Sequence, residues 1–161
     1  MSHTIQKNLI MDGPKSALLY IYMQSDGVEG ELSNFVLVDP KTDFVQSPIK
    51  VQMSITQIWH SFSWFDGMIT FDDTVPYPSW VLTRDTVNYQ DFRYFGGLKD
   101  RSSIDSTGKV LLSTNGFSNA GSVGTMVLEI RKNQPSYPTT YTSPLDRAWP
   151  MQDPNAPRSS T

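Results

Sequence analysis

The residue types that most often carry out catalysis are scarce in this chain. It has two histidines, His3 and His60, and no cysteine, so a histidine-based triad or a thiolate site has few groups to draw on. His60 alternates with Ile58, Phe62 and Trp64, which is typical of a structural histidine on the aromatic face of a strand. For His3, near the start of the sequence, we expect a mobile side chain. No serine lies in a G-x-S-x-G turn, so the sequence predicts no catalytic residue.

Aspartates near predicted strand ends are the other candidates for chemistry. Asp72 and Asp73 are adjacent, and Asp100 and Asp105 stand among hydroxyl side chains, so either group could in principle bind calcium or supply paired carboxylates. Short Asp-rich corners more commonly accept hydrogen bonds from nearby backbone N–H groups. We therefore predict no metal, no other cofactor and no enzymatic activity.

Aromatic side chains are abundant and could form either a core or a sugar-stacking platform. Trp59 and Phe65 are expected to share a face with small Ser61 and Ser63, which predicts a shallow shelf reaching towards Trp64. A second possible platform is the 89–95 loop. The mixed charge of the longer 84–108 loop that contains it favours a protein interface rim, and we select Arg93, Tyr94 and Phe95 as partner-binding residues. The remaining aromatic residues of this group are Trp80, Tyr77 and Tyr89.

The overall composition limits the partners that the protein can have. The chain has 161 residues and a formal net charge of −3, so it lacks the basic footprint of a nucleic-acid-binding protein. Its length suits one domain. We expect no signal peptide and no membrane span, because no apolar run approaches the required length.

Alternation with a period of two predicts strands over residues 17–23, 33–38 and 50–55. The alternation slips at Thr56-Gln57, which we interpret as a bulge or bend that passes the chain to a second sheet. Asp66-Gly67 is typical of a two-residue hairpin turn, here between strands 58–65 and 68–72.

Further strands are predicted at 79–83, 110–113 and 125–132, the last two as a pair, whereas 84–108 is expected to be mostly irregular. The pattern indicates an all-β fold, an antiparallel two-sheet β-sandwich or jelly roll with extended terminal arms. We divide the chain into an N-terminal extension (1–16), the sandwich (17–133) and a C-terminal arm (134–161).

The arm carries six of the eleven prolines, which excludes regular strands and helices and favours an extended polyproline-like segment. Side chains that could anchor it recur along its length, so we expect it to bind a surface, most simply that of a neighbouring chain. Its own domain is an alternative surface, and an ordinary disordered tail is a third interpretation. The predicted anchors are Tyr137, Tyr141, Leu145, Arg147, Trp149 and Met151.

Several runs resemble small proteins encoded among the virion structural genes of tailed bacteriophages. The most specific are F-x-x-x-G-G-L at Phe92 and G-x-V-L-L-S-T-N-G-F at Gly108. The resemblance covers less than half of the chain and offers no catalytic signature. The runs that carry it are 58–59, 69–72, 91–98, 106–117 and 126–132.

The resemblance implies a component of the virion, assembled in the host cytoplasm. We expect a capsid decoration or cement protein that binds the major capsid protein or other virion subunits, and further copies of itself. An accessory protein of the tail or neck is the alternative within the virion. A carbohydrate-binding host-recognition module is an alternative of a different class.

Overall fold

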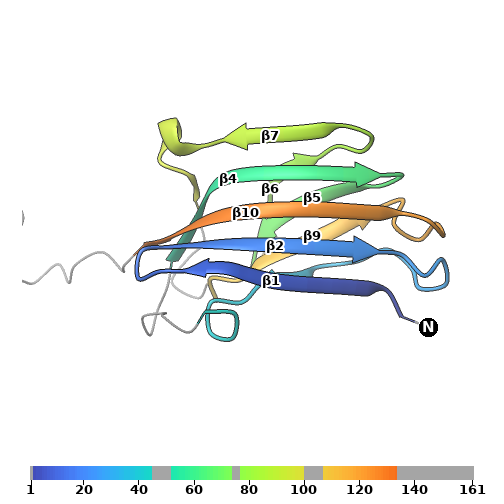
Figure 1. Ribbon diagram of the computed structural model, residues 1–161, viewed down its shortest axis with the longest axis horizontal. Coiled ribbons are helices and arrows are strands. Elements are labelled where there is room, and N and C mark those ends of the chain that lie inside the picture. The colour runs from blue at the N-terminus through green and yellow to red at the C-terminus, as the bar shows by residue number, and fades with distance from the viewer. Residues whose placement is uncertain (1, 45–51, 74–76, 100–106, 134–161) are drawn as a thin grey trace, which may run out of the picture.

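In the computed structural model, which describes residues 2–44, 52–73, 77–99 and 107–133, the chain folds into two packed antiparallel sheets (Figure 1). This confirms the predicted all-β two-sheet sandwich. A single 3-10 turn, η1 (Arg93–Phe95), interrupts the strands of this part of the chain. The strands are β1 (Thr4–Asp12), β2 (Ser16–Gln24), β3 (Phe35–Val38), β4 (Gln52–Ser63), β5 (Asp66–Phe71), β6 (Tyr77–Leu82), β7 (Val87–Asp91), β8 (Leu98–Lys99), β9 (Val110–Asn115) and β10 (Val123–Asn133).

The strand order is that of a jelly roll. One sheet has six strands in the order β1-β2-β10-β4-β7, with β8 also paired to β4, and the other has four in the order β3-β9-β5-β6. Chain neighbours such as β2 and β3, or β4 and β5, therefore lie in different sheets, and the two sheets enclose one core. The larger sheet faces the viewer in Figure 1.

The core between the sheets follows the predicted alternation. Met126, Leu128 and Ile130 of β10 are buried, as expected from their period-two spacing. At one end of the sandwich the ring of Phe65 stacks on Phe62 at 4.4 Å and meets Phe117 edge-on at 4.8 Å. These three rings join segments of both sheets and the β9–β10 loop.

The N-terminal extension predicted for residues 1–16 is wrong for most of its length. Residues 4–12 form β1, which pairs with β2 from Thr4 opposite Gln24 to Asp12 opposite Ala17. Ile5 and Leu9 pack partly against the core. Lys7 stands between them on the same face and its Nζ binds Asp43, so the apolar alternation of this edge strand is too weak to recognise in the sequence.

The predicted bulge near Thr56 is confirmed, because the β4–β10 register shifts there, but β4 stays in the same sheet on both sides of it. The chain instead crosses between sheets at Trp64, whose φ is +74°. The hydroxyl of Thr56 is bonded to the backbone oxygen and carboxylate of Glu129, both at 3.0 Å, which fixes the bulge.

The predicted Asp66-Gly67 hairpin is wrong. Both residues lie inside β5, which pairs with β6 and β9 and not with β4. The Asp66 carboxylate accepts hydrogen bonds from the backbone N–H of Arg84 at 2.7 Å and from Arg84 Nη2 at 2.6 Å. Gly67 is required for close packing, because an added Cβ would lie 2.9 Å from Cε2 of Phe62.

Two other pairing predictions also change. The 110–113 and 125–132 segments do form strands, but β9 lies between β3 and β5 whereas β10 lies between β2 and β4. The 84–108 segment contains β7, η1 and β8, so its described part is more regular than expected. The 134–161 arm lies outside the described residues. Within the described residues, no helix is long and apolar enough to cross a membrane.

Glu31, which precedes β3, holds the loop between β9 and β10. Its carboxylate accepts hydrogen bonds from the backbone N–H groups of Gly116, Phe117 and Ser118 at 2.9–3.1 Å, and from the hydroxyls of Ser118 at 2.8 Å and Thr114 at 2.9 Å. Burial alone would raise the pKa of Glu31, but these bonds, led by those from Ser118, lower it to about 2.

The Glu31→Gln variant is expected to lose about 1–2 kcal/mol of stability at pH 7, a value reduced for solvent screening. Because the folded-state pKa lies below the ordinary glutamate value of 4.5, this stability is present above pH 4.5 and is lost as the pH falls towards 2. Urea unfolding at pH 7 and pH 3 measures it. The two proteins should differ less at pH 3, and an equal difference at both pH values would contradict the assignment.

Candidate binding face on the six-stranded sheet

The outward side chains of the larger sheet form continuous rows across its strands. One row runs directly across five strands, because Asn8 is opposite Tyr20, Tyr20 opposite Val127, Val127 opposite Trp59, and Trp59 opposite Tyr89. Directly opposed residues on one face of a sheet contact each other. The row is therefore a single surface in which three aromatic side chains and Val127 continue from the polar Asn8.

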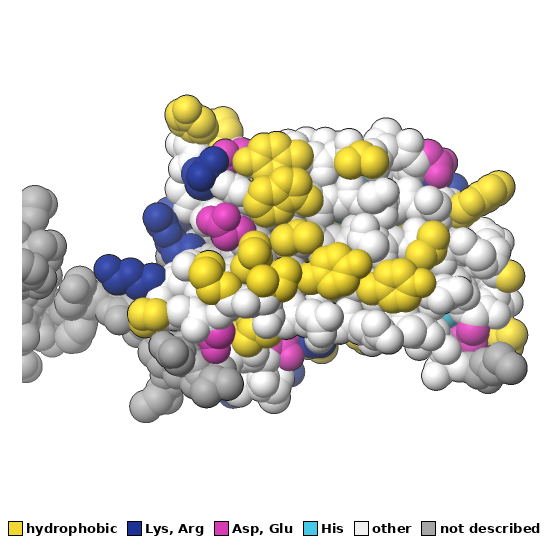
Figure 2. Space-filling model, viewed as in Figure 1, with side chains coloured by type: hydrophobic (Ala, Val, Ile, Leu, Met, Phe, Trp, Pro, Cys, Tyr) yellow, Lys and Arg dark blue, Asp and Glu magenta, His cyan; other side chains and the backbone are white. Residues whose placement is uncertain are grey.

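Trp59 and Tyr89 are the most exposed aromatic pair in this row. Their side chains are 37% and 45% exposed, the ring centroids are 5.0 Å apart, and the ring planes differ by 25°. Figure 2 shows a band of hydrophobic side chains across this face, continuing over the central strands. Large aromatic rings left at the surface are typical of binding sites.

A second row lies beside the first and is also uncharged. It runs from β1 to β7 through Gln6, Tyr22, Thr125, Ser61 and Val87. None of the ten side chains in the two rows carries a charge, although the chain as a whole has a formal net charge of −3. We call these two rows the neutral face.

One border of the neutral face is polar and fixed by its own contacts. Asp91, the last residue of β7, accepts hydrogen bonds from Arg93 Nη2 at 2.6 Å, from the Arg93 backbone N–H at 2.9 Å and from the Tyr89 hydroxyl at 3.2 Å. The Arg93 guanidinium lowers the pKa of Asp91 to about 2. Gln57, oriented so that both amide atoms are satisfied, places its side-chain oxygen 2.7 Å from Arg93 Nε. These groups are held in place beside the Trp59–Tyr89 pair.

Tyr89 belongs both to the aromatic pair and to the polar border of the neutral face. Burial, followed by the nearby Asp91 carboxylate, raises the pKa of Tyr89, so the hydroxyl remains a proton donor at neutral pH. Its ring contacts Trp59 while its hydroxyl binds Asp91. A ligand at this position would therefore meet an apolar surface and polar groups together.

The structure places some of the predicted site residues at this border. Arg93, Tyr94 and Phe95 form η1, which Phe92 alone separates from β7, and Tyr94 and Phe95 are almost fully exposed. The predicted anchors Tyr137, Tyr141, Leu145, Arg147, Trp149 and Met151 lie outside the described residues.

The predicted aromatic shelf is only partly present. Trp59 faces outward as expected, but Phe65 is fully buried and belongs to the core. Trp64 is exposed at the crossing between sheets. The partner of Trp59 is Tyr89, which the sequence places in a different segment.

The histidines and aspartates also have defined positions. His60 is buried, its Nε2 lies 3.2 Å from the backbone oxygen of Thr83, and burial lowers its pKa. The expectation of a mobile His3 is wrong, because its side chain is only 4% exposed. Asp72 accepts a hydrogen bond from the hydroxyl of Thr107, which lies 35 residues further along the chain. Asp100 and Asp105 lie outside the described residues.

Sequence reasoning missed Tyr20 and Tyr22 as surface residues, whereas it had placed Val127 on the outward side of its strand. The 17–23 segment is apolar on both of its faces, which favours a central strand buried on both sides, whereas the structure leaves one side of β2 partly exposed. The sequence did contain a sign of this surface. Val127, on the neighbouring strand, also faces outward and lies opposite Tyr20. Comparisons with protein families, curated proteins and solved structures found no match to this chain.

Proposed function

We propose that the protein is a non-enzymatic structural subunit of a tailed-bacteriophage particle, acting as a capsid decoration or cement protein. Its partners are the major capsid protein or other virion subunits, together with further copies of itself. The resemblance of the 91–98, 106–117 and 126–132 runs to virion proteins supports this station. The observation that carries the binding role is the neutral face, an uncharged and partly aromatic surface across five strands.

The occupant that best fits the neutral face is the 134–161 segment of a neighbouring copy. Extended proline-rich segments bind rows of exposed aromatic side chains, because a polyproline helix is already extended and presents flat apolar surfaces. The segment has six prolines and equal numbers of acidic and basic residues, so its lack of net charge matches the face.

Geometry is compatible with binding between copies. The segment continues from β10, a central strand of the same sheet. In polyproline form, its 28 residues could extend about 85 Å, enough to pass beyond one domain. Each buried aromatic anchor would contribute about 1.5–3 kcal/mol, opposed by the entropy lost in ordering the segment. Repetition across a particle would add avidity.

Deletion of residues 134–161 tests this function. The full chain should self-associate in sedimentation experiments and co-sediment with particles near the copy number of the shell subunit. The deletion variant should lose self-association and at least 90% of its particle occupancy. Unchanged association and occupancy would contradict a role for the segment, and occupancy at only a few copies per particle would favour a tail or neck station.

A glycan-binding role is the second candidate, because the Trp59–Tyr89 pair lies beside the polar groups of Gln57, Asp91 and Arg93. Sugar rings stack on aromatic faces while their hydroxyls bind such groups. A glycan array separates the two functions. Binding that is lost in Trp59→Ala but kept after deletion of 134–161 would support glycan recognition.

A further inference from the structure

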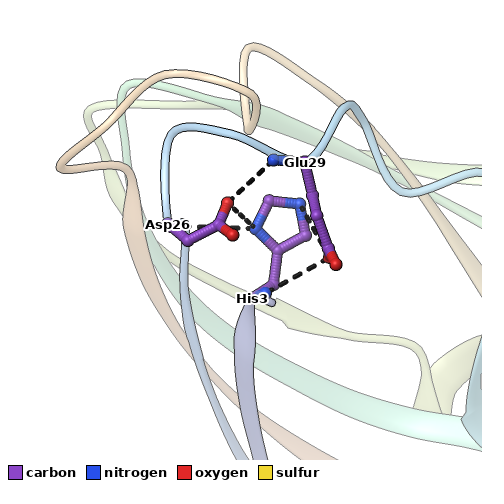
Figure 3. Close-up of side chains that lie close together, drawn as sticks. All are labelled: His3, Asp26 and Glu29. Carbon is purple, nitrogen blue, oxygen red and sulfur yellow. Dashed lines mark hydrogen bonds and ion pairs between the residues drawn. The ribbon is translucent and has the colours of Figure 1, made fainter. Parts of the chain in front are cut away.

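A second site lies at the end of the sandwich where β1 begins. His3 directly precedes β1, and Asp26 and Glu29 lie in the loop that follows β2. Antiparallel pairing of the two strands brings the start of one beside the end of the other. Figure 3 shows the imidazole of His3 between the two carboxylates.

The three side chains are close enough to share one ion. His3 Nδ1 lies 3.3 Å from Asp26 Oδ1, and His3 Nε2 lies 3.9 Å from Glu29 Oε2. One ligand atom from each residue can be chosen so that all lie within 4.8 Å of one another. Zinc bonds to nitrogen and oxygen of about 2.0–2.1 Å in a tetrahedral site separate neighbouring ligands by about 3.3 Å.

The hydrogen bonds of His3 favour the tautomer that a metal requires. Nε2 lies 2.9 Å from the backbone oxygen of Gly30, which can only accept, so this nitrogen carries the proton. Nδ1 then presents its lone pair towards the Asp26 carboxylate. Its protein donor is the Asp26 backbone N–H, at a long 3.3 Å. Metal-binding histidines commonly donate their other ring N–H to a backbone oxygen in this way.

A buried oxygen of Asp26 provides independent evidence. The side chain is only 7% exposed, and Oδ2 is buried without a hydrogen-bond partner among the described residues. Oδ1 accepts from the backbone N–H groups of Val28 and Glu29, both at 2.9 Å, and these bonds lower the pKa of Asp26. Because a buried charged oxygen without a donor is costly, the loop is better satisfied with a cation beside it.

We propose that His3 Nδ1 and the carboxylates of Asp26 and Glu29 bind a divalent transition-metal cation such as Zn²⁺, with water completing the coordination. Mixed nitrogen and carboxylate ligands suit this class of ion. The Glu29 side chain is 49% exposed, so it has room to turn its carboxylate towards the ion. The ion fastens the start of β1 to the β2–β3 loop. This role is independent of the neutral face.

Zinc titration of the untagged full chain tests the site. Isothermal titration should give one Zn²⁺ per chain, and saturating Zn²⁺ should raise Tm by about 5–10 °C relative to protein with EDTA. In Asp26→Asn the remaining side-chain oxygen can still accept from Val28 and Glu29, but the anionic ligand is removed. This variant and His3→Gln should bind Zn²⁺ at least tenfold more weakly.

Asp85→Asn is the matched control, because Asp85 is an exposed aspartate at a positive φ that asparagine tolerates. It should keep the full response to Zn²⁺. Absence of a Zn²⁺-dependent shift in the unaltered chain would overturn the proposal. A Zn²⁺ response in Asp26→Asn and His3→Gln equal to that of the unaltered chain would also overturn it, since the ion would then bind elsewhere.

Discussion

The Phe65→Ala variant is expected to lower the free energy of unfolding by about 3–5 kcal/mol. Phe65 is fully buried, stacks on Phe62 and meets Phe117, so its removal leaves a cavity between the two sheets. The loss also affects the crossing from β4 to β5, which Phe65 occupies. Urea unfolding at pH 7 followed by tryptophan fluorescence measures the change.

Phe95→Ala is the matched control for this variant. Phe95 is the same residue type but is almost fully exposed on η1, so its removal should change stability by less than about 0.5 kcal/mol. Equal losses in the two variants, or a Phe65→Ala protein as stable as the unaltered chain, would contradict the described core.

The double variant Trp59→Ser, Tyr89→Ser is expected to weaken self-association and particle binding at least 30-fold while leaving the fold intact. Partly exposed aromatic residues at the centre of an interface commonly contribute most of its affinity. Serine suits the neighbouring surface of this sheet, where Ser61 and Ser63 already face outward. Sedimentation measures the association, and circular dichroism reports the fold.

Val81→Ser is the control, because Val81 is an exposed apolar residue on β6 of the other sheet. It should retain normal association. If Val81→Ser weakened binding as much as the double variant did, the neutral face would have no special role. If neither variant changed binding, the proposed surface would be wrong.

The sequence predicted the strands well where burial controls the side-chain pattern. Leu19, Ile21 and Met23 alternate with outward residues in β2, and Met126 and Leu128 do the same in β10. These patterns can be recognised within a single strand, because every second side chain of the strand is apolar and buried in the core. The fold class follows from counting such segments.

Strand partners were harder to predict because they depend on residues far apart in the sequence. Asp66-Gly67 has the composition of a hairpin turn, yet the glycine is needed for the nearby ring of Phe62 and the aspartate for Arg84. The glycine that resembled part of a turn is therefore explained by close packing between the two sheets. Edge strand β1 was missed because Ile5 and Leu9 supply little alternation.

The candidate site was predicted as separate parts. Trp59 and the 89–95 loop were both recognised, but only the β4–β7 register places Trp59 against Tyr89. Tyr20 and Val127 join them through the β2–β10 and β10–β4 registers. His3 gave no signal of burial, since its contacts come from a loop more than twenty residues away.

Photo-crosslinking between copies tests the central claim most directly. A photoreactive phenylalanine analogue replaces Tyr141 in one isotopically labelled copy, which is mixed with unlabelled copies and illuminated. The account predicts cross-links between labelled and unlabelled chains at Tyr20, Trp59 or Tyr89, identified by mass spectrometry. Cross-links confined to the four-stranded sheet, or formed only within one chain, would contradict it.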